Sequence, residues 1–270
     1  MNSFTKFLYN NIFGRLMLKI FTSAFFSNLA ALYLKSRLSK HKIKKYIKKF
    51  NIDMNEYEEA KYRSFNDFFI RRIKVESRPF DMNPESLIAV ADSKLSVYKI
   101  NEDSIFNIKD ITYSVSDLIK DEELAKEYLN GLCLIFRLSV ENYHRYSYLD
   151  NGYLGKTEKI KGVLHTVQSI ATDRRKVFAE NSREYAVLHT ENFKEVIHIE
   201  VGAMIVGKIK NSLKQDFKKG EEKGYFEFGG STVVLLLKSD VADINSDILE
   251  SSVNNIETVV KLGEKIGKKH

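Results

Sequence analysis

The second half of the chain consists mainly of short apolar segments rich in β-branched and aromatic residues, and this pattern constrains the fold most strongly. From Gly131 onward it predicts strands at 132–138, 159–167, 185–189, 194–201, 202–207 and 231–237. Helices do not alternate regularly with these segments, which argues against a parallel sheet with crossover helices. We therefore predict a mainly antiparallel β sandwich or barrel.

Two segments before Gly131 predict helices. In residues 64–72, Ser64 is a suitable N-cap with Asp67 three positions later, and phenylalanines 65, 68 and 69 share one face. A second predicted helix covers 114–130 and is closed by Gly131. Together with the N-terminal region described next, these segments predict the α+β class.

The charge of the chain is concentrated at its N-terminal end. The 270 residues carry 43 Lys and Arg against 36 Asp and Glu, a formal net charge of +7. Residues 1–50 hold eleven basic and no acidic side chains (+11), so the remaining 220 residues are slightly acidic (−4). The sequence thus predicts a basic arm on an acidic body, and not a uniformly basic surface. A hydrophobic content of 43% excludes a disordered chain.

Residues 12–34 of this arm are strongly apolar, but Arg15 and Lys19 interrupt them. The uncharged stretch 20–34 is shorter than the ~20 residues that cross a bilayer, and no small-residue cleavage site typical of a signal peptide follows it. Amphipathic helices followed by the lysine-rich segment 35–49 suit the interface of an anionic membrane. Two alternatives remain open at this point, namely a helical hairpin packed on the body and a nucleic-acid-binding arm. We predict a helical membrane-associating region at 1–75 and a β-rich catalytic domain at 76–270.

Cys133 is the only cysteine, which excludes an internal disulfide framework and a cysteine-based zinc site. It lies in an apolar run, so we expect a buried, unreactive thiol.

The segment around Ser231 is the most informative for chemistry. Gly229 and Gly230 precede this serine, which opens an apolar strand. A hairpin or bulge turn is one interpretation, and the segment matches neither a phosphate loop nor a Gly-x-Ser-x-Gly elbow. Alternatively, a glycine in a strained conformation leaves its carbonyl open to attack by the Ser231 hydroxyl. The resulting ester could eliminate, break the chain and leave a pyruvoyl group, provided that a base and oxyanion donors lie nearby.

Two polar residues upstream are candidates to assist Ser231. His144 follows a predicted strand and lies among aromatic residues, and Asp92 ends a short apolar run. An isolated histidine or aspartate is more often structural than catalytic, so neither residue identifies a site by itself.

Taken together, the motifs of this chain resemble the phosphatidylserine decarboxylase proenzyme family, a family of pyruvoyl-dependent decarboxylases. No single motif is specific, but their number, order and spacing are. They are the residue stretches 64–72, 78–81, 91–92, 136–138, 143–145, 178–181, 201–203, 206–207, 219–221 and 228–232.

The resemblance implies self-cleavage between Gly230 and Ser231 into a β chain (1–230) and an α chain (231–270) that stay associated. A pyruvoyl group made from Ser231 would be the cofactor, without metal or pyridoxal phosphate, and would form a Schiff base with the substrate amine. The implied reaction is decarboxylation of phosphatidylserine to phosphatidylethanolamine and CO₂ in phospholipid biosynthesis. The resemblance also implies a peripheral position on the cytoplasmic face of the cell membrane, an anionic membrane surface as partner, a possible homodimer and no nucleic acid.

Residue by residue, Asp92 and Ser231 match the family's charge relay for self-cleavage. His144 matches the first histidine of the pattern Tyr-His-Arg-x-His, whereas Ser147 stands where the second histidine is usual. We therefore predict Ser231, His144 and Asp92 as catalytic residues, and leave open whether His144 serves cleavage, decarboxylation or both. The alternatives are a pyruvoyl decarboxylase of a soluble amino-acid derivative, a non-enzymatic membrane or nucleic-acid module, and a family member that no longer cleaves.

Overall fold

A computed structural model describes residues 3–108, 111–173, 175–203, 208–212, 214–229 and 231–270. Its helices are α1 (Ser3–Asn10), α2 (Ile12–Phe21), α3 (Ala24–Lys35), η1 (Arg37–His41), α4 (Lys42–Phe50), η2 (Met54–Glu56), α5 (Phe65–Phe69), η3 (Val75–Ser77), α6 (Val115–Ile119), α7 (Glu122–Lys126), α8 (Ser169–Thr172), α9 (Val177–Glu180) and α10 (Ser246–Val253). Its strands are β1 (Ser86–Ile88), β2 (Ser93–Lys99), β3 (Ile105–Ile108), β4 (Ile111–Ser114), β5 (Leu132–Leu138), β6 (Arg145–Ser147), β7 (Gly152–Ile160), β8 (Arg183–Thr190), β9 (Glu195–Val201), β10 (Ile209–Asn211), β11 (Asp216–Phe217), β12 (Glu222–Phe226), β13 (Ser231–Leu237), β14 (Ala242–Ile244), β15 (Thr258–Val260) and β16 (Lys265–Lys269).

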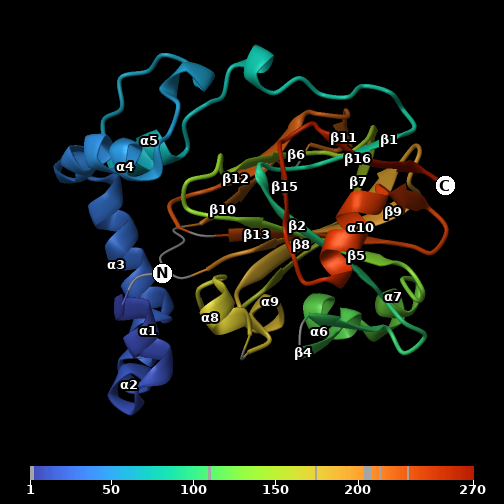
Figure 1. Ribbon diagram of the computed structural model, residues 1–270, viewed down its shortest axis with the longest axis horizontal. Helices are drawn as coiled ribbons and strands as arrows, with labels where there is room; N and C mark the ends of the chain where they lie inside the picture. The colour runs from blue at the N-terminus through green and yellow to red at the C-terminus, as the bar shows by residue number, and fades with distance from the viewer. Residues whose placement is uncertain (1–2, 109–110, 174, 204–207, 213, 230) are drawn as a thin grey trace.

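A large antiparallel sheet forms the centre of the molecule (Figure 1). Its eight strands are ordered β11-β7-β8-β9-β13-β5-β2-β15. Two three-stranded sheets, β10-β12-β6 and β1-β16-β14, lie on one side of it, and helices α6 to α9 lie on the other. The expected α+β class, with N-terminal helices followed by mainly antiparallel sheets, is confirmed.

Strand β13 occupies a central position in the large sheet, and all seven of its residues are buried. It pairs with β5 on one side, where Ser231 lies opposite Leu138, and with β9 on the other, where Thr232 lies opposite Val201. Because both faces of the sheet are covered, the strand is apolar on both faces and reads as a continuous hydrophobic run.

Strands β5 and β13 have the predicted bounds, and the predictions for 185–189 and 194–201 fall on β8 and β9. The prediction at 159–167 is wrong, because strand β7 ends at Ile160. At Gly162 the chain approaches Glu180 so closely that a Cβ would lie 2.2 Å from that carbonyl oxygen. Gly202 and Ala203 follow β9 outside any strand, and 204–207 lie outside the described residues.

The predicted helix at 114–130 is divided into α6 and α7. Lys120 ends α6 in the left-handed conformation (φ 56°), and the Asp121 side chain accepts a hydrogen bond from Leu124 N to cap α7. This local N-cap competes with a continuous helix. The sequence reasoning also missed strands β1 to β4, which precede Gly131. Cys133 is free and fully buried, as expected.

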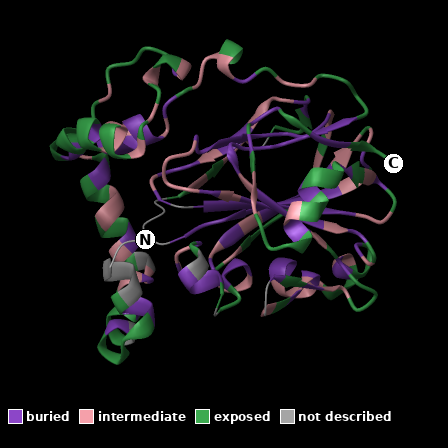
Figure 2. Cartoon of the chain, in the orientation of Figure 1, coloured by how far each residue is buried: buried purple, intermediate pink, exposed green. Residues whose placement is uncertain are grey.

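Helices α1 to α3, the first part of the basic arm at residues 1–50, run along one edge of the molecule (Figure 1). Large apolar residues on α2 and α3 are exposed: Ile12, Phe13, Leu16, Met17, Ile20, Phe25, Leu29, Leu32 and Tyr33. Figure 2 colours much of this part of the chain as exposed. Among the described residues, no single helix is long and apolar enough to cross a membrane; the bent pair 12–21 and 25–35 meets the length and composition test together.

Candidate active site

Ser231 is the first residue of β13 and is fully buried. Its hydroxyl oxygen lies 3.1 Å from Nδ1 of His144, which immediately precedes β6 in the smaller sheet. Pairing of β6 with β12 holds this histidine in place, because the His144 carbonyl accepts a hydrogen bond of 2.9 Å from Phe226 N. The packing of the two sheets therefore brings together two predicted catalytic residues that are 87 positions apart.

The contact of the second ring nitrogen of His144 determines which of its two nitrogens carries the proton. Nε2 lies 3.0 Å from the backbone carbonyl oxygen of Ser139. A carbonyl can only accept a hydrogen bond, so Nε2 must carry the proton and Nδ1 must present its lone pair to the Ser231 hydroxyl. A turn closed by hydrogen bonds between Ser139 and Asn142 holds that carbonyl. His144 is thus oriented as a proton acceptor for Ser231.

Burial keeps this imidazole neutral. His144 has no exposed surface, and its pKa is lowered to about 3, mainly because burial disfavours the charged ring, with a smaller contribution from the Arg71 guanidinium. The hydrogen bond to Ser139 opposes this shift only in part. Near neutral pH the ring is therefore available as a base.

Helix α5 packs directly against both the histidine and the segment that precedes Ser231. The ring of Phe69 lies 4.3 Å from that of His144, and both Phe65 and Phe69 contact Phe228 with ring centroids 5.0 Å apart. The Asn66 side chain accepts a hydrogen bond of 3.1 Å from Phe228 N. The predicted N-cap is also present, since Ser64 Oγ accepts from Asp67 N.

Gly229 has φ 140°, a backbone conformation that L-residues with a side chain rarely adopt. It lies between the anchored Phe228 and the Gly230–Ser231 bond. Gly230 itself lies outside the described residues.

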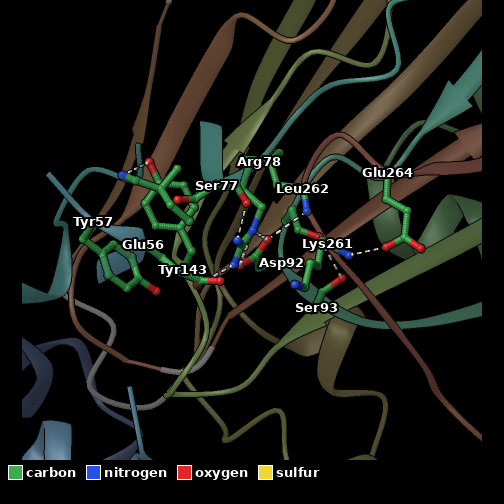
Figure 3. A network of polar contacts seen from close by, with 12 residues as sticks. Glu56, Tyr57, Ser77, Arg78, Asp92, Ser93, Tyr143, Lys261, Leu262 and Glu264 are labelled. Carbon is green, nitrogen blue, oxygen red and sulfur yellow. Dashed lines mark hydrogen bonds and ion pairs between the residues drawn. The ribbon is translucent and has the colours of Figure 1, made fainter. Parts of the chain in front are cut away.

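Asp92 lies in a different network, at the junction of several segments (Figure 3). Its carboxylate accepts hydrogen bonds from Nε (2.8 Å) and Nη2 (2.6 Å) of Arg78 and from Leu262 N (2.8 Å). Arg78 also pairs with Glu56 at 3.1 Å, and these carboxylates outweigh burial and raise the pKa of the guanidinium. Among the contacts of the described residues, none joins Asp92 to His144 or Ser231.

Ser147 lies on β6, where it is buried, and its hydroxyl has no hydrogen-bond partner within the described part of the chain. Within the described residues, Ser147 therefore has no proton acceptor. Sequence reasoning did not identify the Ser139 carbonyl, Asn66 or Phe69 as parts of the site. Residues 64–72 were recognised as a motif, but nothing in the sequence indicated what the motif contacts.

No group of three or more His, Cys, Asp or Glu side chains suited to a metal ion occurs within the residues that the structure describes.

The fold and this pair define a class of protein: a β-sheet enzyme with a buried serine that faces a neutral histidine, arranged for nucleophilic chemistry. Residues 65–268 match the phosphatidylserine decarboxylase family. The chain is 52% identical to phosphatidylserine decarboxylase proenzyme 2 of Clostridium acetobutylicum over 99% of this chain and 92% of the relative. Proenzymes of Clostridium botulinum (strain 657) and Clostridium perfringens (strain SM101) are 43% and 41% identical, over 97% of this chain and 91% of each relative.

The chain therefore belongs to the phosphatidylserine decarboxylase family. The expectation of a decarboxylase made as a proenzyme, which rested on the motifs, is confirmed.

Proposed function

We propose that this protein decarboxylates phosphatidylserine to phosphatidylethanolamine after cutting itself between Gly230 and Ser231. Family membership supports the activity, and one geometric observation supports the residues. A serine at the start of a central strand faces the unprotonated nitrogen of a buried histidine.

In the proposed cleavage, His144 Nδ1 takes the hydroxyl proton while Ser231 Oγ attacks the carbonyl carbon of Gly230. The C–N bond breaks and the Ser231 nitrogen leaves as an amine after it receives that proton, so an ester replaces the amide. Loss of the Ser231 α-proton then breaks the Cβ–Oγ bond, which releases the Gly230 carboxylate and leaves dehydroalanine. Addition of water and loss of ammonia convert it to a pyruvoyl group.

The surroundings of Ser231 fit such a group. The side chain lies in a fully buried position at the start of β13, and its only polar partner among the described side chains is the neutral His144. When present, the pyruvoyl group supplies an electrophilic carbonyl that accepts the electrons of decarboxylation. His144 would hold or deliver a proton at this position during turnover, and the Phe69 ring would limit the access of water to it.

The pairing of the strands supports continued association of the two products. Strand β13 belongs to the α chain but lies between β5 and β9 of the β chain, and β16 pairs with β1. The hydrogen bond from Leu262 N to Asp92 crosses the same boundary, and Arg78 holds this carboxylate from within the β chain. They support a positioning role for Asp92, and its predicted part in the charge relay stays a prediction.

Membrane association is supported by the exposed apolar residues of α2 and α3 and by the lysine-rich helix α4, whereas the cytoplasmic face stays a prediction. The homodimer, the absence of a nucleic-acid partner and the division of the chain at 75/76 stay predictions.

The test is Ser231→Ala compared with Ser239→Ala, a serine in a turn of the same α chain. We expect Ser231→Ala to remain one intact chain by denaturing mass measurement and to release no CO₂ from phosphatidylserine. Ser239→Ala should give two chains and normal turnover. Two chains of the predicted masses in Ser231→Ala would refute the proposed cleavage.

A further inference from the structure

The N-terminal region contains a basic pocket that the active site does not use. It has a volume of about 440 Å³ and is lined by Arg37, Lys40, Lys61, Tyr62 and Arg63, so four of its five lining residues are cationic and none is acidic. The four cationic residues are exposed, and none forms an ion pair with a carboxylate among the described residues. Unpaired cations that converge on one hollow create a strong local positive potential.

The two walls of the pocket are held in a defined arrangement. Arg37 and Lys40 belong to η1, whereas residues 61–63 precede α5. Ser39 joins these walls: it is fully buried, its hydroxyl oxygen accepts a hydrogen bond of 2.8 Å from Phe65 N, and its hydroxyl proton is shared between the carbonyls of Leu34 (2.8 Å) and Ser36 (2.7 Å). The cations are therefore presented from a fixed backbone and not from two independent loops.

Tyr62, the neutral residue of the lining, lies between Lys61 and Arg63 in the sequence. The Tyr62 ring packs edge-on against Phe68 at 5.4 Å, and its hydroxyl is buried without a hydrogen-bond partner among the described residues. Tyr62 is thus the uncharged member of the lining, and the four cations carry the interaction with an anion. Asp67 accepts a hydrogen bond from Arg63 N, and Glu58 and Glu59, which precede Lys61 in the sequence, do not line the pocket.

Exposed leucines that are close to Arg37 and Lys40 in the sequence indicate the source of the anion. Leu38 lies between Arg37 and Lys40 and is 75% exposed, and Leu32 on the adjoining helix α3 is 68% exposed. Phe25, Leu29 and Leu32 follow one another at helical spacing on α3 and are all exposed, which forms an apolar stripe. A phosphate held beside exposed leucines matches a phospholipid, in which the phosphodiester is attached to acyl chains.

We propose that this pocket binds the phosphodiester of an anionic phospholipid and so anchors the enzyme at a second lipid-binding site, separate from Ser231. This inference rests on the proposed membrane association. The pocket would dock the arm on the anionic surface, with the stripe of α3 in the headgroup boundary.

The test compares two triple variants of the full-length enzyme that lose the same charge. The pocket variant carries Arg37→Gln, Lys40→Gln and Lys61→Gln, and the matched variant carries Lys44→Gln, Lys45→Gln and Lys48→Gln on exposed positions of α4. Co-sedimentation is measured at low salt with phosphatidylcholine vesicles that contain phosphatidylglycerol. We expect the partition coefficient to fall about 100-fold in the pocket variant and less than about 10-fold in the matched variant.

Equal losses in the two variants would refute specific binding in the pocket, because general electrostatic attraction between the basic arm and the anionic vesicles would then explain the result. Soluble short-chain phosphatidylglycerol and inorganic phosphate, each titrated below any micelle concentration, separate the two sources of phosphate. Equal affinity for both probes would overturn the phospholipid assignment. Self-cleavage and melting temperature of both variants check folding.

The proposed function fails on different observations. Wild-type protein that binds no vesicles would refute the membrane association, and wild-type protein that releases no CO₂ from phosphatidylserine in detergent micelles would refute the reaction. Either result can be recognised without the variants.

Discussion

The arm exposes large apolar side chains, whereas the catalytic body buries them. In β13 of the body, every residue from Ser231 to Leu237 is buried, whereas α2 and α3 of the arm expose residues such as Phe13 (72%) and Phe25 (78%). The cations differ as well: Arg78 in the body is buried against two carboxylates, while Arg37 and Lys40 in the arm have no such partner in the described structure. The buried apolar side chains of the body stabilise the fold. The exposed apolar side chains of the arm instead indicate a surface that a membrane can cover.

The largest effect should come from the centre of the body. His144→Gln keeps a side chain of similar size but removes the base, and we expect self-cleavage to slow by about 10² to 10⁴-fold. The rate is read from the appearance of two chains after synthesis. His189→Gln, on the partly exposed end of β8, is the control and should cleave normally. A normal rate in His144→Gln would assign the proton transfer to another group.

A pair of leucine truncations tests the two regions against each other. Leu235→Ala removes a fully buried side chain from β13 and should lower the free energy of unfolding by about 2 to 5 kcal/mol. Leu32→Ala removes a mostly exposed side chain and should change it by less than about 0.5 kcal/mol, while it weakens vesicle binding. Denaturant titration of the uncleaved Ser231→Ala chain measures both. A large loss of stability in Leu32→Ala would show that the arm packs like a core.

The buried neutral histidine should make the body sensitive to acid. In the unfolded chain His144 takes up a proton below its ordinary pKa of about 6.5, whereas in the fold its pKa is about 3. The unfolded state therefore binds more protons in this window, and stability falls as the pH falls. At about pH 5 the loss should be about 2 kcal/mol relative to neutral pH.

Denaturant titrations over this pH range measure that slope, and His144→Gln should reduce it by the corresponding amount. An unchanged slope would mean that the fold does not lower the pKa of this imidazole. His165, whose pKa is lowered to about 4 chiefly by burial, adds to the total slope in both proteins.

The smallest effect should arise where the two regions meet. Lys35 Nζ at the end of α3 lies 2.8 Å from Glu227 Oε2, close to the segment that precedes Ser231. Lys35→Gln should cost about 1 to 2 kcal/mol, because the lysine is partly exposed but leaves the buried Glu227 carboxylate without its partner, and high salt should reduce this difference from wild type. A cost that high salt does not reduce would indicate a contact other than charge.

Much of the fold was predictable from local pattern. The bounds of β5 and β13 were correct because each is a continuous apolar run buried on both faces, and Ser64 was identified as an N-cap because its side chain acts on Asp67 N, three positions away. The predictions failed where a local contact overrides periodicity. At Asp121 an N-cap divides the expected helix, and at Gly162 the chain leaves the expected strand to lie against Glu180.

By itself, the sequence determined the family, the α+β class and the separation of a basic arm from an acidic body, because motifs, periodicity and charge can be read along the chain. The tertiary structure alone decided that Nδ1 of His144 faces Ser231, that Asn66 holds Phe228 and that Asp92 joins Arg78 to Leu262. Each of these contacts joins distant positions, 162 apart for Asn66 and Phe228. Such hydrogen bonds depend on the packing of sheets and helices, which local sequence patterns do not predict.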